Sequence, residues 1–219
     1  MIFILKRSEP HCLTELRTQP GARYADLRPP CKDEVREALA REQGFLCCYC
    51  MQRVRVTVGD RHAANELEIE HRVPQSAQEG TGLQLAWKNL LGTCPGNSHT
   101  SAPDQHCGHR KGEQLMSLDP TEAKLELRLR YDALGRVLAE TSELQSELDD
   151  ILNLNATHLR RNRVKALQGF QEALRRKRPR GIWAREWLER QLEPSTRGEL
   201  PEFVGILRWS VRKRRTRPQ

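Results

Sequence analysis

The chain has 219 residues and a mass of 25.3 kDa; 37% of its residues are hydrophobic, 30% are charged, and the formal net charge is +8. This length allows either one sizeable core or a modest core beside a small metal-stabilised module, and the low apolar content favours the second. No apolar run approaches the ~20 residues that cross a bilayer, and residues 1–5 are too short for a signal-peptide core. We therefore expect a cytoplasmic protein without membrane association.

The positive charge is concentrated in the last third of the chain. Residues 159–219 contain 18 Lys and Arg against 6 Asp and Glu (+12), whereas residues 1–158 contain 19 against 23 (−4). Most of these cations are arginines, whose guanidinium groups suit bidentate contacts with phosphate. We therefore predict that this region meets a polyanion or an acidic partner surface; the alternative is a solvated face of surface helices.

The N-terminal segment, residues 1–44, is predicted to be an arm followed by a helix. Residues 1–30 contain four prolines and no clear periodicity, which indicates an irregular arm that either wraps the core or meets a partner. Apolar residues at helical spacing predict a helix over 33–43, and Gly44 is expected to end it.

The middle segment, residues 45–120, is predicted to start with a β-hairpin. Valines alternate with polar residues over 54–58, and Leu67 and Ile69 alternate with glutamates, so each stretch presents one apolar face. A loop rich in Gly, Gln and Ser should then lead to a short helix over 86–91.

The C-terminal segment, residues 121–219, is predicted to hold a second hairpin followed by helices. Leucines alternate with charged residues over 125–129, and a turn ending at Gly135 precedes a strand over 137–140. Helical spacing predicts the remaining elements: a helix over 143–152, a second capped by Asn155, and two more over 182–192 and 199–212. The tryptophans here are expected mostly in the helical core, with base stacking as the alternative; they are Trp183, Trp187 and Trp209.

Four cysteines have the composition of a zinc site. Cys47 and Cys50 form a thiolate pair on a predicted tight turn, and Cys94 and Cys107 supply two more sulfurs. Four thiolates complete the tetrahedral shell that structural zinc prefers. Bound zinc would replace part of the missing apolar core, because metal binding then contributes folding free energy.

Some of these ligands have competitors. Twelve residues separate Cys94 from Cys107, so His99 or His106 could replace one of these two sulfurs. Cys48 could replace Cys47. The remaining Cys12 and Cys31 are expected to be inert. Seven cysteines, an odd number, in a chain with no export signal argue against a disulfide framework.

A carboxylate and an imidazole meet at Glu70-His71, at the end of a predicted strand. A neutral imidazole can take a proton from water, and the carboxylate can ligate a hard divalent cation. Taken alone the pair is weak, since a histidine at a strand end is more often a satisfied hydrogen-bonding residue. The residues that follow make the catalytic interpretation more specific.

Three stretches together resemble the HNH endonuclease motif: Glu70-His71-Arg72-Val73-Pro74-Gln75-Ser76, Asn89-Leu90, and Cys107-Gly108-His109-Arg110-Lys111. The wider pattern is similar to the PtuB-like HNH nucleases of the Septu and retron-associated bacterial anti-phage systems. It consists of Glu42-Gln43-Gly44, Trp87-Lys88-Asn89-Leu90 and Leu152-Asn153-Leu154-Asn155. The resemblance implies an α+β fold: a zinc-stabilised ββα-metal module over 45–120, preceded by the arm and helix and followed by the β-hairpin and basic helical region.

The resemblance also implies a role for each site residue. His71 would be the general base that activates water, Glu70 a ligand of the catalytic metal, and Asn89 the residue that holds the histidine-bearing loop. His109 would be the last metal-binding position, with His106 as its competitor.

The implied reaction is metal-assisted hydrolysis of DNA. One Mg²⁺ or Mn²⁺, distinct from the zinc, would coordinate the scissile phosphate while His71 deprotonates water, and Lys111 would contact phosphate. The implied partner is a larger PtuA-like ATPase of the ABC/SMC type, with or without a retron reverse transcriptase and its nucleic acid. A third reading is that the chain is active only inside that complex.

A protein class without catalysis remains the alternative. In it, the chain is a silent zinc-ribbon adaptor whose basic C-terminal helices bind nucleic acid or a partner. A purely structural ribbon needs none of Glu70, His71, Asn89 and His109, so their joint presence favours the nuclease.

Overall fold

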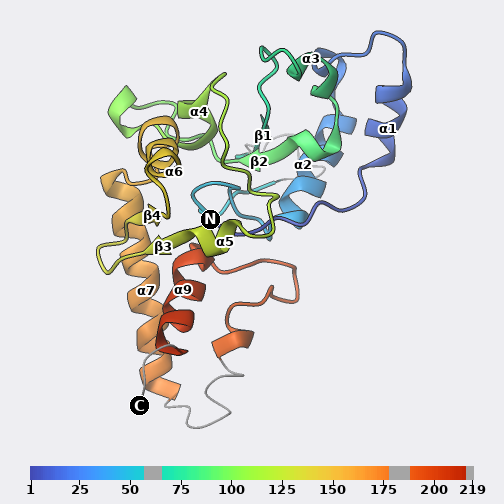
Figure 1. Cartoon of the computed structure of the whole chain (residues 1–219). Helices are drawn as coiled ribbons and strands as arrows, with labels where there is room; N and C mark the ends of the chain where they lie inside the picture. The colour runs from blue at the N-terminus through green and yellow to red at the C-terminus, as the bar shows by residue number, and fades with distance from the viewer. Residues whose placement is uncertain (57–65, 178–187, 216–219) are drawn as a thin grey trace.

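The computed structural model describes residues 1–56, 66–177 and 188–215. Within these ranges the chain has an α+β fold, in which two small antiparallel sheets are surrounded by helices and long connections (Figure 1). This is the class predicted from the sequence. The described residues contain no helix that is both long and apolar enough to cross a membrane.

The N-terminal arm contains a helix that the sequence did not predict, α1 (His11–Thr18). Helix α2 (Cys31–Glu42) agrees with the predicted one, and the chain leaves it through Gly44, whose φ is +61°. Between them lies the single turn η1 (Tyr24–Asp26). The first residues of the arm pack into the core, because Met1, Ile2 and Ile4 are buried.

Cys12 and Cys31 form a disulfide, which corrects the sequence-based argument against disulfide bonding in this chain. Leu13, Leu27 and Leu39 are fully buried in the same small cluster, and their packing folds the arm back on α2. The two Cα atoms therefore lie 5.7 Å apart although 19 positions separate the residues. Sequence spacing alone carries no information about this approach.

The first sheet pairs β1 (Glu68–His71) with β2 (Leu90–Thr93), antiparallel, with Glu70 opposite Leu91 and His71 opposite Leu90. In the described residues β1 pairs with β2 and residues 54–56 form no strand, so the predicted hairpin between 54–58 and the following stretch is not found there. One backbone hydrogen bond, from Glu66 N–H to the Arg55 carbonyl, joins the two segments near the predicted hairpin. Val58 lies outside the described residues. Leu90 and Leu91 of β2 are fully buried, so β1 pairs with a strand that lies in the core.

The predicted helix over 86–91 is correspondingly shorter. Its first part is the 3-10 turn η2 (Trp87–Asn89), after which the chain becomes β2. Three further short elements lie around the first sheet: α3 (Gly80–Leu83), η3 (Ala102–Asp104) and α4 (Cys107–Lys111).

The second hairpin is present as predicted, with β3 (Leu129–Tyr131) antiparallel to β4 (Val137–Ala139). Its first strand is shorter than expected, because 125–128 form one helical turn, α5 (Leu125–Arg128). The turn passes through Gly135, whose φ is +75°.

Helices α7 (Thr157–Lys177) and α9 (Val204–Arg215) lie side by side below the second hairpin (Figure 1). They are preceded by α6 (Ser142–Ser146), which continues as the π-helical turn η4 (Glu147–Ile151). Asn155 does not act as the predicted cap, because its amide group exchanges hydrogen bonds with the backbone of Val137 at 2.8 and 2.9 Å.

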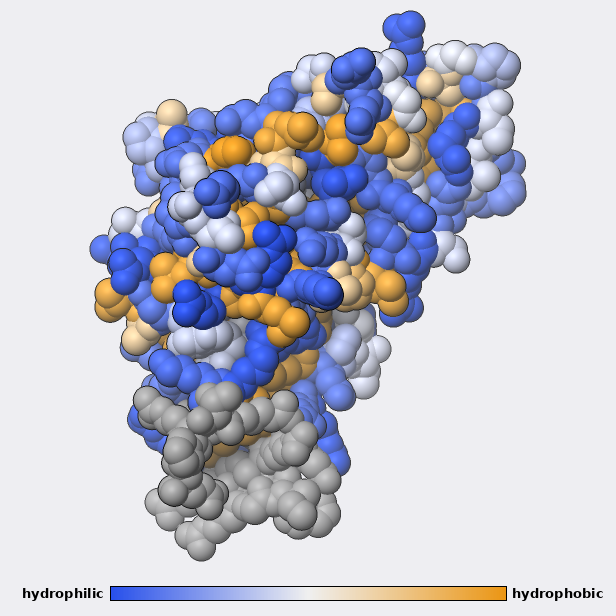
Figure 2. Space-filling model, in the orientation of Figure 1, coloured by the Kyte–Doolittle hydropathy of each residue, from blue (hydrophilic) through white to orange (hydrophobic). Residues whose placement is uncertain are grey.

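The tryptophan prediction can be followed at Trp209, which packs partly buried with its ring 6.5 Å from that of Tyr131. Trp183, Trp187 and most of the predicted helix over 182–192 lie outside the described residues. A large core cluster includes residues from Met1 to Val211, and a smaller one surrounds α1 and α2. On the face shown in Figure 2, hydrophilic residues surround several separate hydrophobic areas.

Candidate functional site

Four cysteine sulfurs converge at the base of the first sheet. Cys47 and Cys50 lie in a tight turn, Cys94 directly follows β2, and Cys107 begins α4. All four side chains are buried, and their sulfur atoms lie within 4.8 Å of one another. The cluster thus connects the turn, the sheet and α4 at one point.

The geometry of this cluster suits a tetrahedral metal ion. Zinc–sulfur bonds of about 2.3 Å imply sulfur–sulfur distances of about 3.8 Å in a tetrahedron. The Cys47–Cys107 and Cys50–Cys94 sulfur pairs are each 3.7 Å apart. The cluster could therefore bind a structural metal such as zinc.

The competing ligands lie around the cluster. Cys48 is buried beside it, but is not part of the group of converging sulfurs. His99 is exposed. His106 is buried with Nδ1 3.0 Å from the Cys107 sulfur, and its ring packs 5.0 Å from that of His158 on α7. His106 is thus placed to donate a hydrogen bond to a sulfur.

Glu70 and Lys111 form a buried ion pair between β1 and α4. The Lys111 ammonium lies 2.8 Å from Glu70 Oε1 and donates to the His71 carbonyl oxygen at 3.0 Å. Tyr49 O–H donates to the same Oε1 at 3.1 Å. Burial raises the pKa of Glu70, and the Lys111 charge and the hydrogen bonds oppose that rise. Only 1% of the Lys111 side chain is exposed, so it does not offer the phosphate contact expected from the sequence.

His71 lines a small pocket and has a contact at each ring nitrogen. Its Nε2 lies 2.9 Å from the Gln84 carbonyl oxygen, a geometry that requires a proton on Nε2. Nδ1 therefore carries the lone pair, with Gln75 Nε2 at 3.5 Å. Burial lowers the pKa of the imidazole, opposed by its hydrogen bond to Gln84. The ring of Tyr24 packs edge-on at 4.6 Å.

Asn89 fixes the loop that follows His71. Its Oδ1 accepts from Val73 N–H at 2.8 Å, and its Nδ2 donates to the carbonyl oxygens of Val73 and Leu83 at 3.0 and 3.2 Å. Asn89 is 2% exposed. Its amide group thus spans the gap between the end of β1 and the start of β2 without reaching solvent.

A pocket of about 210 Å³ opens above β1 and α4. Its lining includes Glu70, His71, Gln75, Gly108 and Lys111. Glu70 Oε2 takes no hydrogen bond from the described residues and is the carboxylate oxygen of the pair that remains available. A side chain at Gly108 would place its Cβ 2.6 Å from this oxygen, so the close approach of the carboxylate to α4 requires glycine at this position.

The structure does not bring His109 to this pocket. His109 is exposed and is not among the lining residues. Because side chains three and four positions apart share one face of a helix, Gly108, Lys111 and Gly112 face the pocket together, and His109 points to one side. Among the described residues, the four cysteines are the only group of three or more His, Cys, Asp or Glu ligands close enough to share an ion.

Comparison with known proteins yields two distant homologues. The chain is 25% identical over 145 residues to "Retron Vc95 putative HNH endonuclease" of Vibrio cholerae serotype O1 biovar El Tor, covering 63% of this chain and 65% of the relative. It is 23% identical over 185 residues to "Retron Ec83 putative HNH endonuclease" of Escherichia coli, covering 68% and 70%. No protein-family model matches the sequence.

Both relatives carry the same family name. Both names support an HNH endonuclease family for this chain. The chain spans slightly less than two thirds of the first relative's length and slightly more of the second's.

Several residues of the site were missed by the sequence analysis. Tyr49 lies inside the cysteine turn, and its position there was the one available indication that it adjoins the site. Tyr24 and Gln84 come from irregular segments, and their contacts with His71 depend on how these segments fold over β1. Lys111 was noted, but its pairing with Glu70 joins residues 41 positions apart in the sequence.

Proposed function

We propose that this chain is an HNH-type endonuclease that hydrolyses phosphodiester bonds of DNA. In this proposal β1, β2 and α4 form the ββα module, and the four cysteines hold a structural zinc that fixes α4 against the sheet. The observation that carries the proposal is the placement of His71: it lines the pocket, its Nε2 lies 2.9 Å from the Gln84 carbonyl oxygen, and its Nδ1 has a long contact of 3.5 Å with Gln75 Nε2.

His71 would act as the general base. Burial lowers the pKa of the imidazole, which favours the neutral form, and a neutral ring can take a proton from water at Nδ1 when that water replaces the 3.5 Å contact with Gln75 Nε2. The proton accepted at Nδ1 makes the ring cationic, and the Gln84 carbonyl stabilises that cation through the hydrogen bond from Nε2. The water oxygen then attacks phosphorus while the bond to the leaving oxygen breaks.

Glu70 Oε2 is the residue atom that would hold a catalytic Mg²⁺ or Mn²⁺. A hard divalent ion is often bound through one or two carboxylates, with phosphate oxygens and water as its other ligands, so a single available carboxylate oxygen fits this use. When bound, such an ion stabilises negative charge on the phosphate and the leaving oxygen. The structure offers no contribution from His109, and we do not assign it one.

Asn89 and Lys111 would be positioning residues. Asn89 fixes the loop after His71 through Val73, and Lys111 fixes the His71 backbone through its carbonyl oxygen. Both act on the direction of the imidazole without touching the substrate. Their loss should therefore reduce the rate more than it weakens DNA binding.

A plasmid-nicking assay tests the proposal. His71→Ala should reduce nicking in Mg²⁺ or Mn²⁺ by at least about 100-fold, since general bases contribute ~10²–10⁴. The exposed His99→Ala is the matched control and should stay within twofold of wild type. Zinc content and unfolding temperature should be unchanged in both variants. Equal nicking by wild type and His71→Ala would contradict the proposed mechanism.

The silent zinc-ribbon adaptor remains a second candidate, favoured by one observation. The described residues near the pocket offer no ligand cluster for an ion beyond Glu70, because the cysteines form the only such group. An adaptor would bind DNA or a partner but cleave nothing, with or without metal. Binding without nicking by wild-type protein under all metal conditions would favour it.

We further propose that the nuclease is the effector of a bacterial anti-phage complex. The support is the retron association in the names of both relatives, together with the sequence resemblance. A PtuA-like ATPase of the ABC/SMC type is the proposed partner. Co-expression with an ATPase encoded beside this gene should give one co-purifying assembly, and separation of the two at modest salt would count against it.

A further inference from the structure

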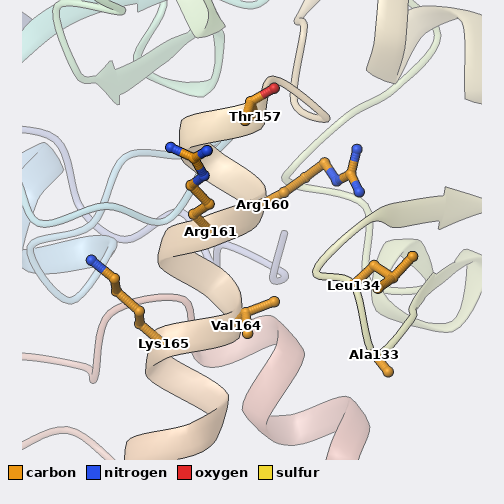
Figure 3. Close-up of a pocket in the computed structure, with 7 residues that line it drawn as sticks. All are labelled: Ala133, Leu134, Thr157, Arg160, Arg161, Val164 and Lys165. Carbon is orange, nitrogen blue, oxygen red and sulfur yellow. The ribbon is translucent and has the colours of Figure 1, made fainter.

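A second hollow, of about 410 Å³, lies between α7 and the turn that joins β3 to β4. Figure 3 shows Arg160 and Val164 on the side of α7 that faces Ala133 and Leu134, with Arg161 and Lys165 projecting from the other side of the helix. The hollow is therefore lined by both aliphatic side chains and cations. None of the described residues that line it is acidic.

Its cations are free to meet a ligand. Among the described residues, Arg160, Arg161 and Lys165 make no ion pair; Arg160 Nε is buried without a hydrogen-bond partner, so a phosphate contact of Arg160 would come from its other guanidinium nitrogens. Arg161 and Lys165 are exposed and four positions apart, so they project about 6 Å apart along the helix axis. This spacing covers nearly two phosphate steps of a DNA strand, at about 3.4 Å each along the duplex.

The hollow is preformed, because the hairpin turn is fixed on α7. Buried Arg163 donates to the carbonyl oxygens of Gly135 and Leu154 at 2.9 and 2.6 Å. The backbone of the turn lies so close that a Cβ at Gly135 would be 2.4 Å from the Arg160 carbonyl oxygen. Arg163 has no carboxylate partner among the described residues, so its charge adds to that of the three cations at the surface.

We infer that this hollow is a DNA-backbone docking site, separate from the pocket at His71. The inference rests on the proposed function, which supplies a polyanionic substrate. Guanidinium groups match phosphate oxygens in pairs, and an aliphatic floor without aromatic rings offers no stacking platform for bases. The site should therefore hold phosphates without reading sequence, and position DNA on the protein rather than cut it.

Binding of a labelled 20-base-pair duplex to the full-length His71→Ala protein tests this inference without cleavage. The variant Arg160→Gln/Arg161→Gln/Lys165→Gln should bind at least tenfold more weakly at about 100 mM salt. The slope of log affinity against log salt should become shallower by about 2 to 3, since each phosphate contact contributes about 0.9. Zinc content and unfolding temperature should be unchanged.

A matched variant removes the same charge elsewhere on the same helix. Arg175→Gln/Arg176→Gln/Lys177→Gln changes three exposed cations at the far end of α7 and should weaken binding less than threefold, with a slope change below 1. If both variants lose the same amount of DNA affinity, the effect is one of net charge alone and the inference is overturned. It is also overturned if neither variant loses affinity. Poly-glutamate is a second probe that stands for an acidic protein partner. If the hollow variant loses binding to poly-glutamate but still binds DNA, the assignment is also overturned.

These results are independent of whether the chain is a nuclease. Binding is measured in a background without the proposed base, so absent cleavage does not affect it. If wild type fails to nick DNA but the hollow variant still loses binding, the proposed catalytic function fails and the docking site stands.

Discussion

The ion pair between Lys111 and Glu70 predicts a large loss of stability in Lys111→Met. Methionine keeps much of the aliphatic stem but removes the ammonium group. Of its partners among the described residues, Glu70, 8% exposed, would then retain the Tyr49 hydroxyl, and the His71 carbonyl oxygen would lose the Lys111 donor. Removing one partner of a buried ion pair costs on the order of 3–5 kcal/mol, because a buried charge is left uncompensated.

Thermal unfolding of the zinc-bound protein measures this loss. In a chain of this size 1 kcal/mol corresponds to roughly 2–4 °C, so Tm should fall by roughly 6–20 °C. The loss should grow as the pH rises. Burial already raises the pKa of Glu70 above its ordinary value of 4.5, and losing Lys111 removes the main opposing charge. A Glu70 pKa that is higher in the folded than in the unfolded protein stabilises the fold below pH 4.5, and this stabilisation is lost as the pH rises through the folded pKa. Lys111→Met should therefore lose more stability relative to wild type at pH 8 than at pH 5.5.

Two further variants make this reasoning refutable. Lys88→Met changes an exposed lysine and should alter stability by no more than about 0.5 kcal/mol. Lys111→Met/Glu70→Gln removes both charges and should recover most of the lost stability. If Lys111→Met unfolds at the same temperature as Lys88→Met, or if the double variant is no more stable than Lys111→Met, the buried pair does not stabilise α4 against β1.

Four more outcomes are expected. Asn89→Ala leaves the Val73 backbone groups without partners and should destabilise the protein by on the order of 3 kcal/mol, measured by urea unfolding; a cost under 1 kcal/mol would contradict the clamp. The rate of nicking should rise with pH and level off, with a midpoint below 6.5, because burial lowers the pKa of His71; a midpoint above 7 would exclude a buried neutral base. Cys50→Ser should reduce bound zinc from one equivalent to near none and lower Tm, whereas full retention of zinc would exclude the four-sulfur site. His109→Ala should nick DNA within about threefold of wild type, and a 100-fold loss would return His109 to the site.

Local patterns explain what the sequence revealed. The helix that became α2 and the second hairpin depend on periodicity and turn residues within 15 positions, and both are found close to their predicted places. Cys47, Cys50, Cys94 and Cys107 were named from residue type and spacing, and their sulfurs converge.

Long-range packing explains what the sequence did not reveal. Pairing of β1 with β2 joins stretches about 20 residues apart, and the run from Trp87 to Leu91 reads as helix until its burial is known. Which residues of α4 face the pocket depends on the helix starting at Cys107, and that start turns Gly108 and Lys111 inward and His109 outward. No motif encodes that orientation.

The bridge between Cys12 and Cys31 affects how this protein should be handled in the laboratory. The bridged loop contains Tyr24, whose ring rests on His71. A thiol reductant added to protect the four metal-binding cysteines would also open the bridge and release the covalent tether of that loop. A buffer chosen to retain zinc is therefore not the buffer that keeps the loop tethered. Preparations made in the two buffers should be compared with each other before their nicking rates are compared.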